Sequence, residues 1–299
     1  MSVNWQIEFK NQPFEIVAPR QWTAPAVFNS PHSGATYPPA FLALSRLDPV
    51  ALRKSEDCFI DTLFGCVTEL GAPLLKAHFP RAYLDVNREP YELDPRMFRE
   101  ELPGYANTGS IRVAAGLGTV PRIVCEGEEI YRLPLRLEDV LQRIDMIYRA
   151  YHRTLSSLTA QVHDSFGAVL LVDCHSMPSS AATLVSTNES IVDVVLGDRH
   201  GAACGETITA LLEEVLRAQG LKVVRNKPYA GGFITQSHGS PLSGKHALQI
   251  EINRALYMSE KTLEASANFE VMQKILRTAL QSLLGELDNL LKPMRLAAE

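Results

Sequence analysis

The sequence contains little that would tie it to a membrane, to nucleic acid or to an oxidising compartment. Its five cysteines are scattered, odd in number and without a C-x-x-C pair, a pattern typical of reduced thiols. No apolar run approaches the roughly 20 residues that span a bilayer, and the N-terminus has neither the basic start nor the apolar core of a signal peptide. The net charge of −5 is not offset by a basic cluster, which argues against a nucleic-acid surface. We therefore expect a soluble, cytoplasmic protein with no membrane or nucleic-acid partner; the sequence does not indicate an oligomeric state.

Two common catalytic signatures are also missing, an H-E-x-x-H zinc motif and a G-x-S-x-G nucleophile elbow. The second absence argues against a serine nucleophile at Ser33 or Ser176, although each serine follows a histidine. Cys174 precedes His175, but adjacent strand residues point to opposite faces of a sheet, which argues against a thiol nucleophile. Any catalytic group must then come from positions that are distant in the sequence.

The length and the pattern of elements predict one α/β domain. Hydrophobic residues make up 46% and charged residues 21% of the chain, as in ordinary globular proteins. A helix over 137–166, stopped by Gly167, runs directly into an apolar strand, the order expected for an α/β sheet. We expect a single domain over residues 1–299 with two long irregular excursions, 89–127 and 226–245, of which the second resembles a mobile flap. Further strands are expected at 26–28, 73–79, 82–88, 191–196, 221–225 and 247–253, and further helices at 49–70, 206–219 and 260–291.

The apolar run Ala168–Val172 is typical of a buried strand, and the polar residues Asp173 and His175 follow it. In an open α/β sheet, ligands bind just beyond the carboxyl ends of the strands, so these side chains are placed for chemistry. A buried histidine satisfied by hydrogen bonds is the ordinary alternative for one histidine alone. Other strand ends carry similar groups, however, and two imidazoles with one carboxylate are a common catalytic zinc set. The polar groups at strand ends or adjoining turns are His32, Asp85, Asn87, Arg88, Asp173, His175 and Glu251.

An acidic pair lies within the helix expected over 49–70. The helical period places Glu56 in the middle of the apolar stripe and Asp57 at its edge. A carboxylate so close to a buried face requires a partner, whereas a surface acid at a helix end does not. Periodicity alone therefore favours Glu56 as the inward-facing acid.

Six motifs, taken together and in order, resemble the N-formylglutamate amidohydrolase (deformylase) family over about residues 25–260. They are Ser30–Gly34, Ser55–Asp61, Asp85–Arg88, Asp173–Pro178, Gly231–Gly232 and Gln249–Arg254. The resemblance implies a three-layer α/β/α sandwich with a mixed, mostly parallel sheet, similar to zinc carboxypeptidases and aspartoacylase.

The resemblance also implies one divalent metal ion, with zinc as the expected metal, held by His32, an acid and His175. Carboxypeptidases and aspartoacylase place the acid three residues after the first histidine, where this chain has Ala35. The acid must therefore come from further along the chain. The family pattern favours Asp57 and helical periodicity favours Glu56; we choose Asp57.

The chemistry of formamide hydrolysis suggests roles for the remaining groups. Zinc activates water and polarises a carbonyl, and Arg88 with Asn87 beside it can hold a substrate carboxylate by a two-pronged contact. Glu251 lies on the polar face of its strand, where it can act as the general base; an ion pair with Arg254 or with a neighbouring strand is the alternative. A substrate with two carboxylates needs a second cation, and the candidates are Arg81, Arg225 and Arg254.

The expected reaction is the hydrolysis of N-formyl-L-glutamate to L-glutamate and formate, as in a histidine-degradation route. A deacylase of another N-acyl or N-formyl amino acid is the first alternative, because an amino-acid carboxylate would fit the Asp-x-Asn-Arg motif in either case. A non-catalytic ligand-binding protein on the same scaffold is the second, although the presence of both histidines, both acids and Glu251 argues against it.

Overall fold

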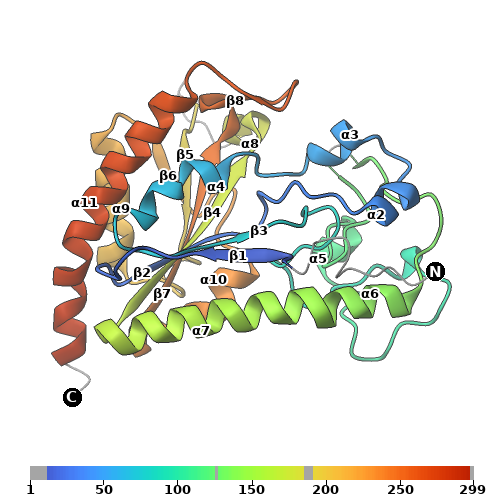
Figure 1. Ribbon diagram of the computed structural model, residues 1–299, viewed down its shortest axis with the longest axis horizontal. Coiled ribbons are helices and arrows are strands. Elements are labelled where there is room, and N and C mark those ends of the chain that lie inside the picture. The colour runs from blue at the N-terminus through green and yellow to red at the C-terminus, as the bar shows by residue number, and fades with distance from the viewer. Residues whose placement is uncertain (1–11, 125–126, 185–190, 297–299) are drawn as a thin grey trace. The chain divides into compact units, whose positions relative to one another are not determined.

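The computed structural model describes residues 12–124, 127–184 and 191–296, which form two compact units (Figure 1). Of the described residues, one unit contains 12–15, Pro31–Glu56 and those between Lys76 and Thr154. The other contains Ile16–Ser30, Asp57–Leu75 and the described residues from Leu155 onward. The single domain over residues 1–299 stays a prediction.

A seven-stranded sheet, most of which belongs to the second unit, has the strand order β1-β3-β2-β4-β7-β5-β6. The pairs β2–β4, β4–β7 and β5–β6 are parallel, and β5–β7 is antiparallel. This arrangement confirms the predicted α/β fold with a mixed, mostly parallel sheet. The strands are β1 Phe14–Val17, β2 Ala26–Ser30, β3 Leu74–Ala77, β4 Val169–Met177, β5 Val194–Gly197, β6 Val223–Arg225 and β7 Lys245–Asn253.

Strand alternation separates an apolar face of β4 and β7 from a polar one. Leu170, Val172 and Cys174 of β4, with Leu248, Ile250 and Ile252 of β7, pack into one apolar cluster. Helices α4 (Ile60–Leu63), α9 (Glu206–Ala218) and α11 (Phe269–Leu296) cover this face. Helix α10 (Phe233–His238) packs against the same two strands on the other face, toward which Asp173, His175, Gln249 and Glu251 point.

The first unit is largely irregular and is built around aromatic contacts. Phe41 stacks on Tyr37 and packs against Tyr83 and Tyr131. The stretch 89–127 is mostly without regular structure where it is described, as predicted, and contains two short helical segments. The helical segments of this unit that precede Ile144 in the described residues are α2 Pro39–Leu44, α3 Pro49–Arg53, η2 Pro95–Met97, α5 Ile111–Ala114 and α6 Leu137–Arg143.

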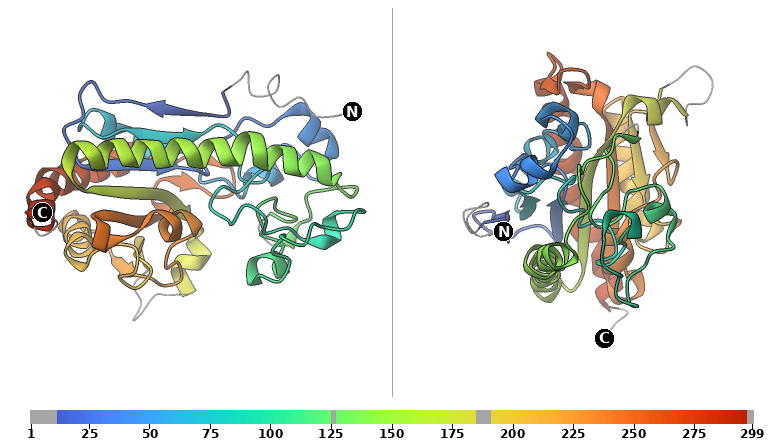
Figure 2. Two further views of the ribbon diagram at one scale, coloured as in Figure 1. Left: turned by 90° about the horizontal axis from the view of Figure 1, so that it is seen from below. Right: turned by 90° about the vertical axis from the view of Figure 1, so that its right-hand side faces the viewer.

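The long helix predicted over 137–166 is confirmed. It consists of α6, the π-helical turn η4 (Ile144–Tyr148) and α7 (Arg149–Phe166), and Figure 2 shows α7 as a long, straight helix. Gly167 follows with φ 78°, a left-handed conformation that ends the helix before β4. None of the helices in the described ranges is both long and apolar enough to cross a bilayer.

The helix predicted over 49–70 is wrong. Helix α3 ends at Arg53, and Phe59 has φ 65°, which a right-handed helix cannot accommodate. Helical structure resumes in α4 and in the short 3₁₀ segment η1 (Gly65–Thr68). The acidic pair thus lies between helices, and the periodicity that favoured Glu56 does not apply.

Three other predicted elements also differ from the structure. Residues 82–88 form turns rather than a strand, because Tyr83 N–H bonds back to the carbonyl of Pro80 and Asp85 N–H bonds to Thr119. The irregular stretch 226–245 contains α10 and η5 (Pro241–Ser243). The last helix begins at Phe269, after the short hairpin β8 (Met258–Ser259) and β9 (Glu264–Ala265).

Candidate metal centre and active site

The carboxyl end of β4 holds His175 between two carboxylates. His175 Nδ1 lies 3.0 Å from Asp57 Oδ2, and Nε2 lies 2.9 Å from Asp173 Oδ2. The other oxygen of Asp173 accepts a 2.7 Å hydrogen bond from Asn29 Nδ2. An imidazole that donates from Nε2 to a carboxylate presents Nδ1 as a lone pair, the arrangement of a histidine prepared for a metal ion. Asn29 was not identified from the sequence.

Asp57 is held on its other side by Ser176 and Arg254. Its Oδ1 accepts hydrogen bonds from Ser176 Oγ at 2.9 Å and from Arg254 Nη2 at 3.0 Å, and Arg254 Nε donates to Ser176 Oγ. All three side chains are buried. Arg254, which the sequence suggested as a substrate-binding cation, is therefore the ion-pair partner of Asp57.

The electrostatic field at His175 favours a positive charge. Burial opposes a second proton on the ring, but the charge and hydrogen bond of Asp173, the hydrogen bond of Asp57 and the charge of Glu251 raise its pKa well above the ordinary value. Glu251 contributes because it is the register partner of His175 in the β4–β7 pair. The carboxylates that favour an imidazolium here favour a divalent cation for the same reason.

A second buried histidine–aspartate pair lies in the first unit. His32 Nε2 is 2.8 Å from Asp85 Oδ1, which also accepts the backbone N–H of Asn87 at 2.9 Å. The other oxygen, Oδ2, lies 2.9 Å from Arg81 Nε and 3.6 Å from Arg88 Nε. Burial would raise the pKa of Asp85, but Arg88, Arg81 and His32 outweigh it and hold the pKa well below its ordinary value. Asp85 is thus an ionised anchor for one imidazole and two guanidinium groups.

Arg88 is fixed mainly by the backbone. Its Nε donates to the carbonyl of Leu117 and its Nη1 to the carbonyl of Asn87, both at 2.9 Å. Burial lowers its pKa to about 10 against the opposing charge of Asp85, so the guanidinium stays charged at neutral pH. A guanidinium has five N–H groups and these two hydrogen bonds use two of them, so N–H groups remain that can bind a carboxylate.

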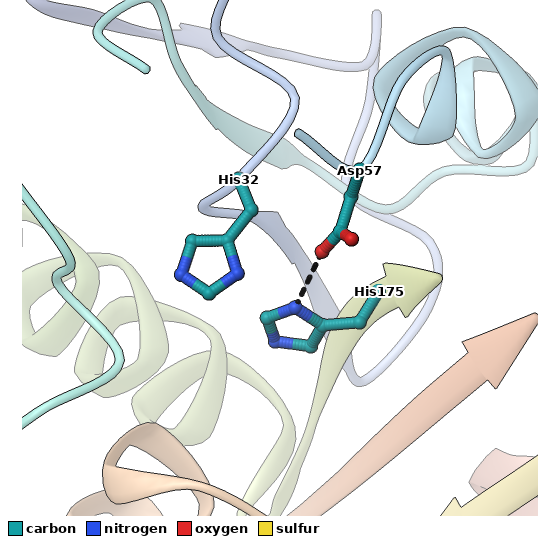
Figure 3. A group of neighbouring side chains, drawn as sticks. All are labelled: His32, Asp57 and His175. Atoms are coloured by element: carbon teal, nitrogen blue, oxygen red, sulfur yellow. Dashed lines mark hydrogen bonds and ion pairs between the residues drawn. The ribbon is translucent and has the colours of Figure 1, made fainter. Parts of the chain in front are cut away.

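His32, Asp57 and His175 each offer one ligand atom, and these atoms lie within 4.8 Å of one another (Figure 3). All three residues are buried, and they form the one group of this kind within the described ranges. Two imidazole nitrogens and one carboxylate oxygen match the ligand set of catalytic zinc sites, which keep a fourth position open. Glu56 instead bonds to Tyr37 Oη at 2.6 Å and to Arg53 Nε at 3.1 Å. The geometry thus favours Asp57 over Glu56 as the acidic ligand.

The remaining candidates divide between the polar face of the sheet and its surroundings. Glu251 is buried on the polar face of β7, and its Oε1 accepts a 2.7 Å hydrogen bond from Gln249 Nε2. Arg225 is paired with Glu206 and Glu213 of α9. Cys174 lies in the apolar cluster, where burial raises the pKa of its thiol well above the ordinary value, so its side chain points away from His175 as predicted.

Sequence reasoning missed Asn29 and Ser176 as supporting residues. Both are buried polar side chains at the ends of buried strands, next to residues that had been singled out. A buried amide or hydroxyl in such a place needs a partner, and that requirement is the signal that could have identified them.

Comparisons with known proteins point to one family. The family model described as N-formylglutamate amidohydrolase matches residues 24–258. An N-formylglutamate deformylase of Pseudomonas aeruginosa is 29% identical over 276 residues, which cover 91% of this chain and 97% of that protein. One of Pseudomonas putida is 27% identical over 249 residues, 82% of this chain and 86% of that protein. The crystal structure of an N-formylglutamate amidohydrolase from Ralstonia eutropha superimposes with a TM-score of 0.85 at 34% identity, covering 94% of this chain and 99% of that one.

Proposed function

The chain belongs to the N-formylglutamate amidohydrolase family, and from this premise we propose that it hydrolyses N-formyl-L-glutamate to L-glutamate and formate with one divalent metal ion. The observation that carries the proposal is the buried group of His32, Asp57 and His175. Its nitrogen and oxygen donors suit zinc. Each histidine also bonds through Nε2 to an aspartate, as metal-binding histidines commonly do.

A zinc ion bound to these three residues would supply an activated water and polarise the formyl carbonyl. The side chains around it have a matching task. Asp173 and Asp85 fix the ring orientations and the tautomers of the two histidines, and Arg254 and Ser176 fix the carboxylate of Asp57. Each proposed ligand is therefore held before any ion binds, which lowers the entropic cost of binding.

We assign the general base to Glu251. Its carboxylate is on the polar face of β7, across from His175 in the strand register. It would take the proton that the attacking water loses and return it to the amine as the carbon–nitrogen bond breaks. Such proton transfer by a positioned side chain typically contributes 10²–10⁴-fold to the rate.

Substrate holding falls to Arg88, with Asn87 beside it. The rigid guanidinium can bind one substrate carboxylate through its two terminal nitrogens. For the second carboxylate of N-formylglutamate we favour Arg81, which is only partly buried, over Arg254, whose guanidinium is committed to Asp57 and Ser176. Arg225 is already paired with two glutamates.

A substrate panel tests the proposal. Zinc-loaded protein is incubated with N-formyl-L-glutamate, N-formyl-L-glutamine and N-acetyl-L-glutamate, and release of the free amino acid is measured. We expect kcat/KM for N-formyl-L-glutamate to exceed that for N-formyl-L-glutamine by at least about a hundredfold, because the amide leaves a cation unpaired. A preference for another N-acyl amino acid would select the alternative substrate, and no turnover of any compound would indicate a ligand-binding relative.

A further inference from the structure

Gln249 is a buried amide on β7, two residues before Glu251 and on the same face of the strand. Its side chain is 4% exposed. Oε1 accepts a 2.7 Å hydrogen bond from the backbone N–H of Gly232, and Nε2 donates a 2.7 Å hydrogen bond to Glu251 Oε1. Gly232 is the residue immediately before helix α10. One side chain therefore links the start of a helix to the proposed base.

The chemistry of the partners fixes which end of the amide faces which group. A backbone N–H can only donate, so the atom that faces Gly232 must be the amide oxygen. The NH₂ group then has to face Glu251. A carboxylate is a strong acceptor for such a donor, and the contact restricts the orientation of the glutamate side chain.

An analogous arrangement lies on the neighbouring strand. There Asn29 donates to Asp173, and Asp173 in turn binds His175. Asp173 is the register partner of Gln249, just as His175 is the register partner of Glu251. Each of the two adjoining strands thus carries a buried polar residue that orients the functional group two positions further on.

We propose that Gln249 is a positioning residue for the reaction: it holds Glu251 by a hydrogen bond to Oε1 of the glutamate, so that Oε2 of the glutamate accepts and returns the proton. This inference rests on the proposed function, in which Glu251 is the general base. It extends that function because the orientation of the base then depends on Gly232 and the first turn of α10. Replacing a residue that orients a metal ligand typically lowers metal affinity or activity by about 10–100-fold, and we expect a similar range for a residue that orients the base.

Two substitutions separate positioning from simple packing. Gln249→Glu keeps an oxygen that accepts from Gly232 N–H but cannot donate to Glu251 when ionised. Gln249→Met keeps the length and volume of the side chain and removes both hydrogen bonds. We expect kcat for N-formyl-L-glutamate to fall at least about tenfold in both variants, while KM changes less than about twofold and the metal content stays that of the wild type.

Asn253 provides a matched control, since it is a 2% exposed amide on the same face of β7 that donates to the carbonyl of Val192 and accepts from the backbone N–H of Ala255, and makes no bond to Glu251. Asn253→Leu should lower the melting temperature and leave kcat of the folded protein within about twofold of wild type. If Gln249→Met keeps wild-type kcat while Glu251→Gln loses activity, the inference fails and Gln249 only anchors α10. If Glu251→Gln itself keeps wild-type kcat, the assignment of the base fails instead.

Discussion

Two regions of the molecule each fix one histidine by a hydrogen bond to an aspartate: the carboxyl ends of β4 and β7, and the turns over residues 80–92. They differ in where the aspartate comes from and in the charged groups around it. At the sheet, His175 is bonded to Asp173, two residues away on one strand face. In the turns, His32 is bonded to Asp85, which is 53 residues away in the sequence. The groups around His175 are mostly carboxylates, whereas those around Asp85 are guanidinium groups. The difference suggests a division of labour: both regions fix a proposed metal ligand, the sheet adds the proposed general base, and the turns add the guanidinium groups that would hold the substrate.

Glu251→Gln should produce the largest loss of kcat, and it tests whether the sheet supplies the general base. The amide keeps the shape of the side chain and cannot accept the proton of the attacking water. We expect kcat to fall by at least about a hundredfold, with KM and metal content nearly unchanged. Steady-state kinetics and elemental analysis measure these quantities. Retention of most of kcat across neutral pH would make Glu251 a structural residue.

Arg88→Lys tests whether the turns hold the substrate. Lysine keeps the charge but loses the planar fork, so kcat/KM should fall on the order of a hundredfold, or about 2.7 kcal/mol, with the metal content unchanged. Arg96→Lys is a control a short distance further along the chain, because the Arg96 side chain is 59% exposed and donates hydrogen bonds to Asp94 and to one backbone carbonyl. If Arg88→Lys loses its metal or does not fold, Arg88 is structural and the substrate clamp lies elsewhere.

The two aspartates allow the regions to be compared with the same substitution. Asp173→Asn and Asp85→Asn should each weaken zinc binding about 10–100-fold, since each removes the carboxylate that orients a histidine. Only Asp85→Asn should also raise KM, because Arg81 and Arg88 lose their shared anion. Zinc titration and kinetics at saturating zinc separate the two effects. An equal rise of KM in both variants would abolish the proposed division of labour.

The sheet was more predictable than the turns, for a physical reason. Alternation along β4 and β7 is a local rule, so it correctly sent His175 and Glu251 to one face and Cys174 to the other. The turns depend on distant partners that no local pattern reveals. Asp85 N–H bonds to Thr119, which converts an alternating sequence that resembles a strand into a turn.

The acidic ligand shows the same limit. Helix α3 already ends at Arg53, before Glu56, and the left-handed residue Phe59 keeps α3 and α4 from joining into the one helix on which the argument for Glu56 was based. The family pattern favoured Asp57 because a motif reflects the folded positions of its residues, whereas helical periodicity considers only the local backbone. The contacts of Asp57 with His175, Ser176 and Arg254 explain that pattern in physical terms.

The smallest expected effect concerns His246, which contrasts with His175 within the same sheet. Burial lowers the pKa of His246 to about 4, from 6.5 in the unfolded chain. Its Nδ1 accepts a hydrogen bond from Gly205 N–H, which a second ring proton would oppose. The neutral ring therefore stabilises the fold fully above about pH 6.5, and this contribution falls as the pH drops toward 4; at pH 5 the loss is about 2 kcal/mol.

Chemical denaturation at pH 7 and pH 5 measures this loss, with His246→Gln as the comparison. Glutamine can accept from Gly205 N–H and does not titrate in this range. The variant should lose about 2 kcal/mol less of its unfolding free energy than the wild type over the same pH change. Identical losses in the two proteins would show that His246 is not the titrating group.

The most direct test of the account is the metal content of His175→Ala, measured by elemental analysis after saturation with zinc and removal of unbound metal. The wild type should hold about one ion per chain, and the variant should hold almost none, because a catalytic zinc site needs three protein ligands. His246→Gln, which changes a buried histidine outside the proposed ligand set, should keep the wild-type content. A full complement of zinc in a folded His175→Ala protein would contradict the assignment of His32, Asp57 and His175 as the metal centre.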